Sequence, residues 1–431
     1  MKKNLLYNKA KKIILGGNML VSKNPDMILP EYWPSYFHKT KKTHVWTEHK
    51  KYLDMMCYVG QNTLGYNHSD IDNEVIKKIK LGNMSTLNSP EEVELAEELL
   101  KIHSWADMVK FARSGGEANA MAIRIARAAS RKDNIAICGY HGWHDWYLSV
   151  NLKNKNDLND HLLPGLKPIG VPKKLINTTH AFNYGDIDQL YQIIKKHDLA
   201  AIKMEVGRSS LPDINFLNEV RELTNKKKII LIFDECTSGF RRNLGGLHLT
   251  TKVNPDIAMF GKALGNGFAI TSVIGKSKYM EKAKKSFISS TFWTERVGFV
   301  AGIKTLKTMK KIKSWEKLIQ SGKYINSQWK KLSKKYDLPI TISGIESITQ
   351  FSFKQNNILY KTFITQELLK KNILGSNLVF INIYHKKKII DYYINKLDKI
   401  FYKIKKIDES KIKRNILAGK ISKISFKRLT G

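Results

Sequence analysis

Residues 229–267 read IILIFDECTSGFRRNLGGLHLTTKVNPDIAMFGKALGNG and contain two short, mainly apolar runs, Ile229–Phe233 and Asp256–Phe260. Runs of this length with so few polar residues are typical of strands that are buried on both faces of a parallel sheet. The first run is followed directly by an acid, Asp234, and the second by a lysine between glycines, Lys262. We therefore expect two strands whose carboxyl ends carry these two side chains.

The same alternation extends toward the N-terminus. Met108–Ala112 precedes a glycine turn and a helical stretch at Glu117–Ser130, and further strand-like runs follow at Asn134–Gly139 and Ala200–Glu205. Strands separated by helices predict an α/β fold with a largely parallel sheet. Ligands of such sheets bind beyond the carboxyl ends of the strands. Because every chemically notable residue follows one of these runs, the sequence predicts a single active site.

The two ends of the chain follow a different pattern. Tyr52–Met56 and Ile340–Phe353 are expected strand regions, and 356–372 is an expected helix. The Lys-rich tail after Lys386 keeps the apolar spacing of an amphipathic helix. We expect a smaller α+β domain that both chain ends build, and a large domain between them, with the boundaries 1–62, 63–308 and 309–431.

Composition limits the class of protein. With 431 residues, 42% of them hydrophobic, the chain can bury a large core and form more than one domain. Its three cysteines are far apart and predict no disulfide framework. Lysines interrupt the N-terminal apolar residues, which argues against a signal peptide, and the apolar runs are too short to span a bilayer. We expect a soluble, cytoplasmic protein with no membrane partner.

The formal net charge of +36 raises the alternative of a nucleic-acid-binding protein. The charge comes from 63 lysines and only 11 arginines, and the lysines are scattered along the chain. Arginine is the better reader of phosphates and base edges, because its planar group binds them with two parallel hydrogen bonds. We interpret the charge as compositional background and expect no nucleic-acid partner.

Two glycine-containing turns follow strands in the first half of the large domain. Ser114-Gly115-Gly116 joins a strand to a helix, where free N–H groups form an anion site, although such turns are also common structural elements. Tyr140 follows the next strand and is placed to stack on a planar cofactor. His141 and His144 suggest a metal site, but no cysteine or carboxylate cluster completes one. We expect no metal, and histidines that form hydrogen bonds within the fold.

Asp234 and Lys262 suggest the chemistry. A buried carboxylate needs a partner, and the pyridinium N–H of pyridoxal 5'-phosphate (PLP) would be one. The alternative for Asp234 is a helix cap. A lysine in an apolar, glycine-rich turn favours the neutral amine that imine chemistry needs. The alternative for Lys262 is an ordinary surface lysine.

Together these motifs resemble the class III PLP-dependent aminotransferases, most closely their glutamate-1-semialdehyde aminomutase-like branch. The resemblance implies PLP as the cofactor and the PLP-dependent transferase fold type I, whose large domain has a mostly parallel seven-stranded sheet. The residues that carry it are Ser114–Ala118, Tyr140–Gly142, Asp234–Arg241 and Gly261–Gly267, and it extends from Gly16-Gly17 through Leu64–His68 to Phe426–Thr430.

The resemblance also implies a role for individual residues. Lys262 matches the lysine that forms a Schiff base with PLP, and Asp234 matches the carboxylate that pairs with the pyridine nitrogen. Thr291 matches a threonine that reaches the phosphate in the neighbouring subunit, which implies a homodimer with shared active sites. The other implied cofactor-binding residues are Ser114, Gly115, Gly116 (where the family more often has Ser or Thr), the stacking Tyr140, His141 and Glu205.

The chain departs from the family pattern where the substrate is expected. After Thr291, the chain reads Phe292-Trp293-Thr294-Glu295-Arg296 in place of the common Leu-Ser-Gly-Asn-Pro, and Lys23 stands where the aminomutase has an arginine. Val206 replaces the proline of a Glu-Pro pair, and Asn151–Gly170 lacks the Gly-rich lid that we expect of an aminomutase. The candidate substrate-binding residues are Arg241, Arg296, Trp293 and Lys23, with a structural ion pair as the alternative for Arg241.

These departures favour an aminotransferase that moves an amino group between a small amino donor and an aldehyde or ketone acceptor, through the aminated cofactor (PMP). The first alternative is a glutamate-1-semialdehyde 2,1-aminomutase, which transfers the amino group within one molecule. The second is a basic binding protein without catalysis, against which Lys262, Asp234 and Tyr140 argue. Other class III members decarboxylate or racemise their substrates, and no single residue excludes these reactions.

Overall fold

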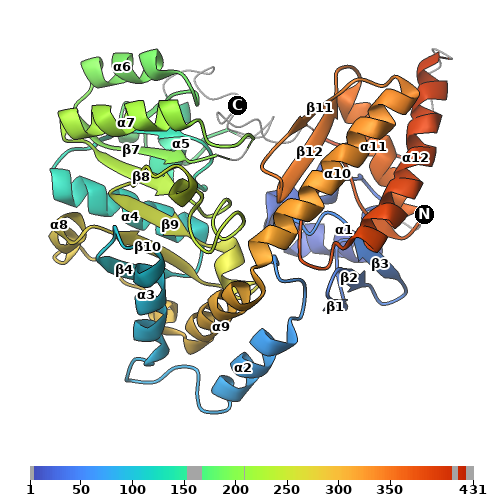
Figure 1. Ribbon diagram of the computed structural model, residues 1–431. Coiled ribbons are helices and arrows are strands. Elements are labelled where there is room, and N and C mark those ends of the chain that lie inside the picture. Colours follow the sequence, from blue (N-terminus) through green and yellow to red (C-terminus); the bar gives the residue numbers. More distant parts are fainter. Residues whose placement is uncertain (1–3, 153–166, 208, 410–415, 424–431) are drawn as a thin grey trace. The chain divides into compact units, whose positions relative to one another are not determined.

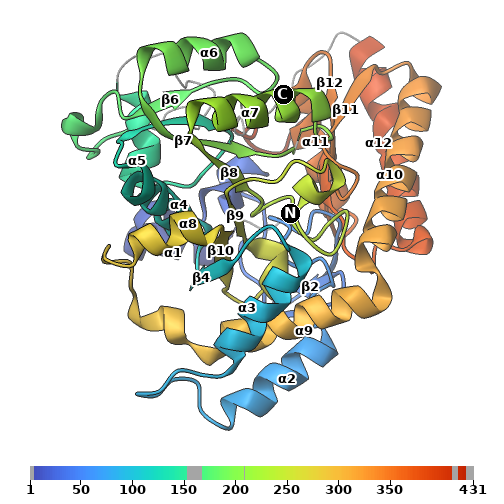
Figure 2. The same ribbon diagram turned by 60° about the vertical axis from the view of Figure 1, so that its left-hand side comes forward.

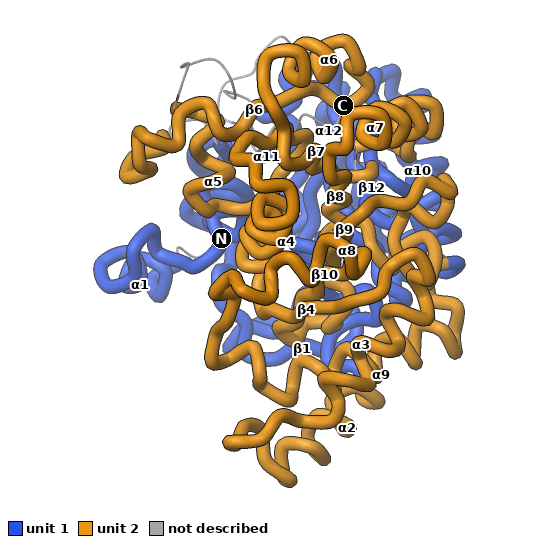
Figure 3. The backbone as a smooth tube through the Cα atoms, turned by 90° about the vertical axis from the view of Figure 1, so that its left-hand side faces the viewer, with its two compact units in different colours: residues 1–68, 316–425 blue, residues 69–315, 426–431 orange. Residues whose placement is uncertain are grey.

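The computed structural model describes residues 4–152, 167–207, 209–409 and 416–423. The chain divides into two compact units, one formed by Met1–His68 with Glu316–Ser425 and one built from Ser69–Trp315 (Figure 3). The domain boundaries expected at 62/63 and 308/309 stay a prediction. The motif Phe426–Thr430 and most of Asn151–Gly170, where we expected no Gly-rich lid, lie outside the described residues.

The larger unit contains a seven-stranded sheet (Figure 1). Its strand β10 runs antiparallel to both of its neighbours, and the other strands run parallel to one another. This confirms the mostly parallel sheet and the strands that we expected from the apolar runs. The spatial order is β4 (Met108–Ala112), β10 (Thr271–Gly275), β9 (Ile257–Phe260), β8 (Ile230–Asp234), β7 (Leu199–Glu205), β5 (Asn134–Cys138) and β6 (Thr179–Ala181).

Helices cover this sheet, which is why its central strands are apolar. All residues of β7, β8, β9 and β10 are buried. Helix α4 (Gly115–Ser130) packs across five strands and begins at a capping box between Ser114 and Glu117. Helices α6 (Ile187–Lys196) and α7 (Ile214–Lys227) pack on each other (Figure 2). The unit also contains α2 (Ser69–Ile79), α3 (Glu91–Ile102), α5 (Asp145–Leu148), α8 (Ser277–Met280) and α9 (Arg296–Ile312).

The smaller unit joins the two ends of the chain in one α+β structure. One sheet pairs β3 from the N-terminal part with β13 from the C-terminal part, in parallel. The expected strand region at 340–353 forms a hairpin of two strands, β11 and β12. The sheets are β1 (Lys39–Lys41), β2 (His44–Trp46), β3 (Lys51–Asp54) and β13 (Ile373–Leu374), and β11 (Ile340–Ser343), β12 (Ile348–Phe353) and β14 (Leu378–Phe380).

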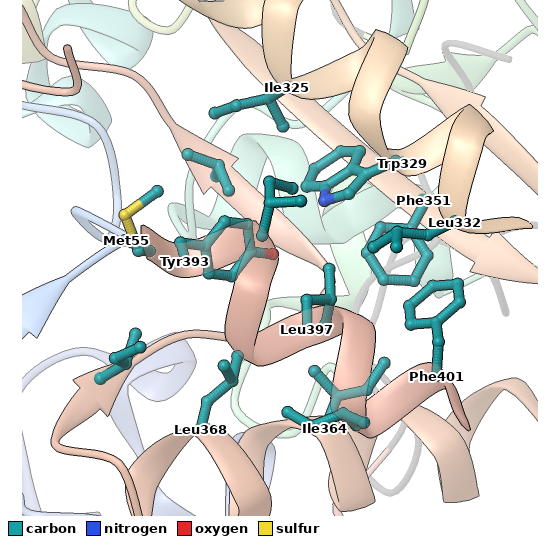
Figure 4. Close-up of a cluster of buried hydrophobic side chains, with 14 of the residues drawn as sticks. Met55, Ile325, Trp329, Leu332, Phe351, Ile364, Leu368, Tyr393, Leu397 and Phe401 are labelled. Carbon is teal, nitrogen blue, oxygen red and sulfur yellow. The ribbon is translucent and has the colours of Figure 1, made fainter. Parts of the chain in front are cut away.

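Four helices complete this unit, namely α1 (Leu5–Ile13), α10 (Ser314–Tyr336), α11 (Asn357–Leu369) and α12 (Lys387–Glu409). Trp329 of α10 and Tyr393 and Leu397 of α12 lie in its core (Figure 4). The amphipathic tail helix is thereby confirmed. Within the described ranges, none of the helices combines the length and the apolar composition that crossing a membrane would require.

Candidate active site

The segments that follow β4, β5 and β8 meet at the carboxyl edge of the sheet in the larger unit. A Cβ atom added to Gly115 would lie 3.5 Å from Sγ of Cys236, and one added to Gly142 would lie 3.3 Å from Cα of Gly116. The contact at Gly142 is tight, and its φ of +104° lies in the region that favours glycine. The structure therefore brings together the glycine turn, the aromatic segment and the acid predicted from the sequence.

Asp234 ends β8 and is 4% exposed. Its Oδ2 accepts a hydrogen bond from Nδ1 of His141 (2.8 Å) and lies 4.0 Å from Nζ of Lys203, and its Oδ1 accepts one from the backbone N–H of Cys236 (3.1 Å). Burial alone would raise the pKa of the carboxyl, but the Lys203 ammonium and the His141 hydrogen bond outweigh it and hold this pKa well below its usual range. Asp234 is therefore ionised at neutral pH.

His141 orients this carboxylate. The side chain is fully buried, and burial lowers its pKa, so the imidazole is neutral at pH 7 and carries its proton on Nδ1. Its Nε2 has no hydrogen-bond partner among the described residues. Among all residues that the structure describes, no three His, Cys, Asp or Glu side chains are grouped so that they could hold a metal ion. His141 thus contacts Asp234, and its direct role in cofactor binding stays a prediction.

Lys262 begins a 3₁₀ turn that follows β9, with φ of +44°. Its Nζ donates a hydrogen bond to Oγ1 of Thr237 (2.6 Å). The carbonyl of Thr237 accepts one from Nε of Arg241 (2.6 Å), and Arg241 is fully buried. The sequence interpretation missed Thr237, although it stands three residues after Asp234 inside a motif already singled out. These contacts fix the lysine amine beside the segment that carries Asp234.

Tyr140 and Glu205 lie next to this segment. The backbone N–H of Tyr140 donates to Oε2 of Glu205 (3.2 Å), which ends β7 in a buried position. A Cβ atom on Gly139 would lie 2.7 Å from the same oxygen, and Gly139 has φ of +112°. Glycine at this position therefore permits the carboxylate to reach the backbone of Tyr140, whose half-buried ring packs edge-on against Tyr147.

The N-terminus of α4 has the features of an anion site. Its first N–H groups, which belong to Gly115 and Gly116, have no acceptor within the helix, as in any helix. A Cβ atom on Gly116 would lie 2.6 Å from Cε1 of His144. Nδ1 of His144 is buried without a hydrogen-bond partner among the described residues. Glycine in place of a larger residue thus lets an imidazole with a free nitrogen lie against the start of the helix.

The segment 293–296, which departs from the family pattern, also reaches the start of α4. Nε1 of Trp293 donates to Oε1 of Glu117 (3.1 Å), the acid of the capping box. Arg296 binds Glu91 through two hydrogen bonds of 2.9 and 2.8 Å. Burial opposes ionisation of Glu91, but its hydrogen bonds from Arg296 and Lys78 are stronger and lower its pKa to about 2. Trp293 therefore lies close to the predicted phosphate site, whereas Arg296 is held by an acid of its own chain.

Two predicted residues are not brought into this group by the described contacts. Thr291 is exposed in the 3₁₀ turn Thr291–Thr294. Lys23 is exposed and belongs to the smaller unit. The predictions of a phosphate contact for Thr291 and a substrate contact for Lys23 therefore stay predictions.

The sequence interpretation also missed Lys203. This residue is fully buried in the middle of β7, 4.0 Å from Asp234. A signal was present, because a lysine two residues before Glu205 interrupts an otherwise apolar strand and points to the same face as that acid.

Comparison with known proteins identifies the family. Residues 33–381 match the family model for Aminotransferase class-III. The chain belongs to this family. The 3-aminobutyryl-CoA aminotransferase of Cloacimonas acidaminovorans (strain Evry) is 32% identical over 395 residues, which cover 88% of this chain and 90% of the relative. A glutamate-1-semialdehyde 2,1-aminomutase of Sulfurisphaera tokodaii is 29% identical over 80% of this chain and 83% of the relative.

Solved structures show the same fold. The aminotransferase superposes on the PLP internal aldimine form of the FumI protein of Sphingopyxis sp. MTA144 with a TM-score of 0.85 and 23% identity, over 95% of this chain and 98% of FumI. An omega-transaminase of Sphaerobacter thermophilus gives a TM-score of 0.80 and 22% identity, over 92% and 96% of the two chains. Fold type I is thereby confirmed for this aminotransferase.

As a class III aminotransferase, the protein uses PLP and acts on an amino donor and a carbonyl acceptor. The site contains groups of the types that PLP needs. These are an anion site at the start of α4, an ionised buried carboxylate for a ring nitrogen, and a lysine amine held by a hydroxyl group. The residues of this structure therefore fit the cofactor.

Proposed function

We propose that this aminotransferase exchanges an amino group between two separate substrates, with Lys262 as the covalent attachment point of PLP and Asp234 as the partner of its ring nitrogen. The observation that carries the proposal is the buried, ionised Asp234, which lies three residues from the threonine that holds Lys262. A helix cap, the alternative role for Asp234, would not need a buried carboxylate with two hydrogen-bond donors and a lysine at 4.0 Å.

The mechanism assigns each residue one task. Bound PLP supplies an electron sink for the substrate carbon that carries the amino group. Nζ of Lys262 would take a proton from this carbon as general base and would then deliver it, as general acid, to the cofactor's C4' carbon, so that the amino group stays on the cofactor. Oγ1 of Thr237 orients that amine, and His141 orients the carboxylate of Asp234, which would pair with the ring nitrogen. The start of α4, with His144 beside it, would hold the phosphate and so position the cofactor.

A homodimer with shared active sites is part of this proposal. Thr291 is exposed, and the nearby Phe292 and Phe287 are 67% and 86% exposed. These two residues are close in sequence, and large exposed aromatic side chains are typical of surfaces that a partner covers. A second copy of the chain on this surface would give Thr291 access to the partner's phosphate. The cytoplasmic location expected from the sequence stays a prediction.

The proposal for the substrate pocket rests on the segment 291–296. The indole of Trp293 donates a hydrogen bond to Glu117, the acid of the α4 capping box, and so lies close to the predicted phosphate site. We propose Trp293 as the residue that shapes the substrate pocket. The guanidinium contacts of Arg241 and Arg296 with their own chain do not support a substrate role, which stays a prediction for both. Because a relative is named a 3-aminobutyryl-CoA aminotransferase, a β-amino acyl thioester is the first donor to test.

The proposal is tested with purified, PLP-loaded protein. Borohydride reduction and peptide mapping should place the pyridoxyl label on Lys262, and a label on another lysine would refute that assignment. A donor such as 3-aminobutyryl-CoA should release about one carbonyl product per site and then stop until an acceptor is added. Glutamate-1-semialdehyde alone should not sustain turnover. Many turnovers to 5-aminolevulinate would instead establish the aminomutase.

A further inference from the structure

Lys203 is an unusual residue for the middle of a parallel sheet. It lies in β7 between β5 and β8, and its side chain is fully buried. Its Nζ lies 3.1 Å from Sδ of Met259, a weak acceptor, and 4.0 Å from Oδ2 of Asp234. An ammonium group carries three strong donors, so these contacts satisfy it poorly. Its charge is therefore balanced mainly by Asp234.

The sheet register explains how these two residues meet. In the parallel pair of β7 and β8, Lys203 lies opposite Ile232, and Glu205 lies opposite Asp234. Side chains two residues apart in a strand point to the same face, so Lys203, Glu205 and Asp234 share one face of the sheet. Lys203 therefore contacts Asp234 from within the sheet, two residues before the carboxyl end of β7. Lys262 lies at the carboxyl edge itself, in the turn that follows β9.

Packing alone does not account for a lysine at this position. Methionine or leucine would fill a similar volume without the loss of hydration that a buried ammonium suffers, and such replacements of buried charges are often neutral or stabilising. Burial lowers the pKa of Lys203, while the charge of Asp234 favours its protonated form. The other titratable groups that act on this pair are His141, Glu205 and Cys236, and Lys262 acts in turn on Cys236.

We propose that Lys203 is a positioning residue that acts through Asp234 and weakens the hold of this carboxylate on the ring nitrogen of PLP. The inference rests on the proposed role of Asp234. With Lys203 charged, one carboxylate faces two cations, the ammonium below it and the ring N–H. Asp234 then gives each of them less stabilisation than it would give one alone. Lys203 thereby lowers the affinity of the site for PLP and the pH up to which the ring nitrogen keeps its proton.

The test compares the wild-type holoenzyme with Lys203→Met. Each protein is loaded with PLP that carries ¹⁵N at the ring nitrogen, and the ¹⁵N chemical shift is followed against pH. In Lys203→Met the ring nitrogen should lose its proton about one pH unit or more higher, and the dissociation constant of PLP should fall about tenfold. Lys110→Met, on β4 of the same sheet, removes one charge from a half-buried position and should leave both values unchanged.

An unchanged titration together with an unchanged dissociation constant would overturn the inference, and so would weaker binding of PLP to Lys203→Met. Lys203→Gln carries the same expectation if the methionine variant does not fold. Failure of both variants to fold would make Lys203 a purely structural residue and would likewise overturn the inference.

Two further variants separate this inference from the proposed function. If Asp234→Asn leaves the ¹⁵N titration unchanged, the role of Asp234 itself fails. If Asp234→Asn changes the titration and Lys203→Met does not, only the role of Lys203 fails. In the Asp234→Asn background, Lys203→Met should alter the dissociation constant less than about twofold, because an unpaired buried lysine loses its proton. A full tenfold effect there would mean that Lys203 acts on PLP without Asp234.

Discussion

Replacing Asp234 with asparagine removes one charge and almost no volume. The amide oxygen can take the position of Oδ2 and accept the hydrogen bond from His141, and the NH₂ group then replaces the Oδ1 that accepts from the N–H of Cys236. The amide cannot balance the charge of Lys203, which stands 4.0 Å from the carboxylate in the wild type. It also presents an NH₂ group to a site where a carboxylate oxygen accepted hydrogen bonds. The substitution therefore tests the effect of the charge of Asp234 with little change in the shape of the side chain.

The size of the effect follows from burial. Truncation of one partner of a buried ion pair costs about 3–5 kcal/mol. If the lost charge is the one that stabilises the ring nitrogen during catalysis, the same energy appears in the barrier, where about 1.4 kcal/mol is a factor of ten. We expect the rate of the half-reaction with an amino donor to fall by about 10²- to 10³-fold. The stability loss should lie at the lower end of the range, because Lys203 can lose its proton.

The assay measures both quantities and compares them with a matched variant. Asp256 is another buried carboxylate of this sheet, at the opposite edge, where it binds Arg221 (3.1 Å) and Lys276 (2.8 Å). Asp256→Asn should lower the free energy of unfolding by a similar amount and leave the rate of the half-reaction within about twofold. Single-turnover absorbance changes give the rate, and urea unfolding gives the stability.

The reasoning would be refuted if Asp234→Asn unfolded as easily as Asp256→Asn but reacted at the wild-type rate. Asp234 would then be a structural acid that pairs with Lys203 and caps the turn after β8. A large loss of rate in both variants would point to a general weakening of the sheet.

Three further predictions address the phosphate site, the dimer and pH. Gly116→Thr should weaken PLP binding at least about tenfold, because its Cβ would lie 2.6 Å from His144, and adding His144→Ala should restore part of that affinity in equilibrium dialysis. Mixed, exchanged subunits of inactive Lys262→Ala and Thr291→Ala should regain about a quarter of wild-type activity, whereas no recovery after verified exchange would place Thr291 outside the partner's site. The pKa of Glu91 is lowered to about 2, so its stabilising ion pairs are complete above about pH 4.5 and are lost as the pH falls toward 2. The difference in unfolding free energy between wild type and Glu91→Gln should therefore shrink over this window, and a constant difference would contradict the assignment.

The sequence predicted the elements whose pattern is local. The apolar runs at 229–233 and 256–260 correspond to β8 and β9 within one residue at each end, because strands buried on both faces need unbroken apolar side chains. Strand β10 was not predicted. It contains Thr271 and Ser272, which are buried although polar, so its sequence does not read as an apolar run. Its burial comes from its central place between β4 and β9 and from the packing of α4 against it, which no local pattern reveals.

The residues of the candidate site also divide into those that a local sequence pattern predicted and those that it did not. Motif loops at strand ends indicated Ser114, Tyr140, Asp234 and Lys262, because parallel strands place their carboxyl ends at one edge. What the loops could not indicate is which strands are neighbours. Lys203 meets Asp234 only because β7 lies beside β8, and this order is fixed by the packing of the whole sheet.

The loops and the strands therefore contribute different properties to the site. In the function that we propose, loop residues such as Lys262 and Thr237 supply or orient the groups that act on the reacting atoms, and we expect a change in them to remove the activity. A strand residue such as Lys203 lies within the sheet, 4.0 Å from the carboxylate of Asp234, so we expect a change in it to alter the charge of the site more than its shape. Two aminotransferases with identical motifs can accordingly differ in cofactor affinity and in the proton affinity of the ring nitrogen. The residues that set this difference lie in the apolar strands, where a charged side chain is the signal to look for.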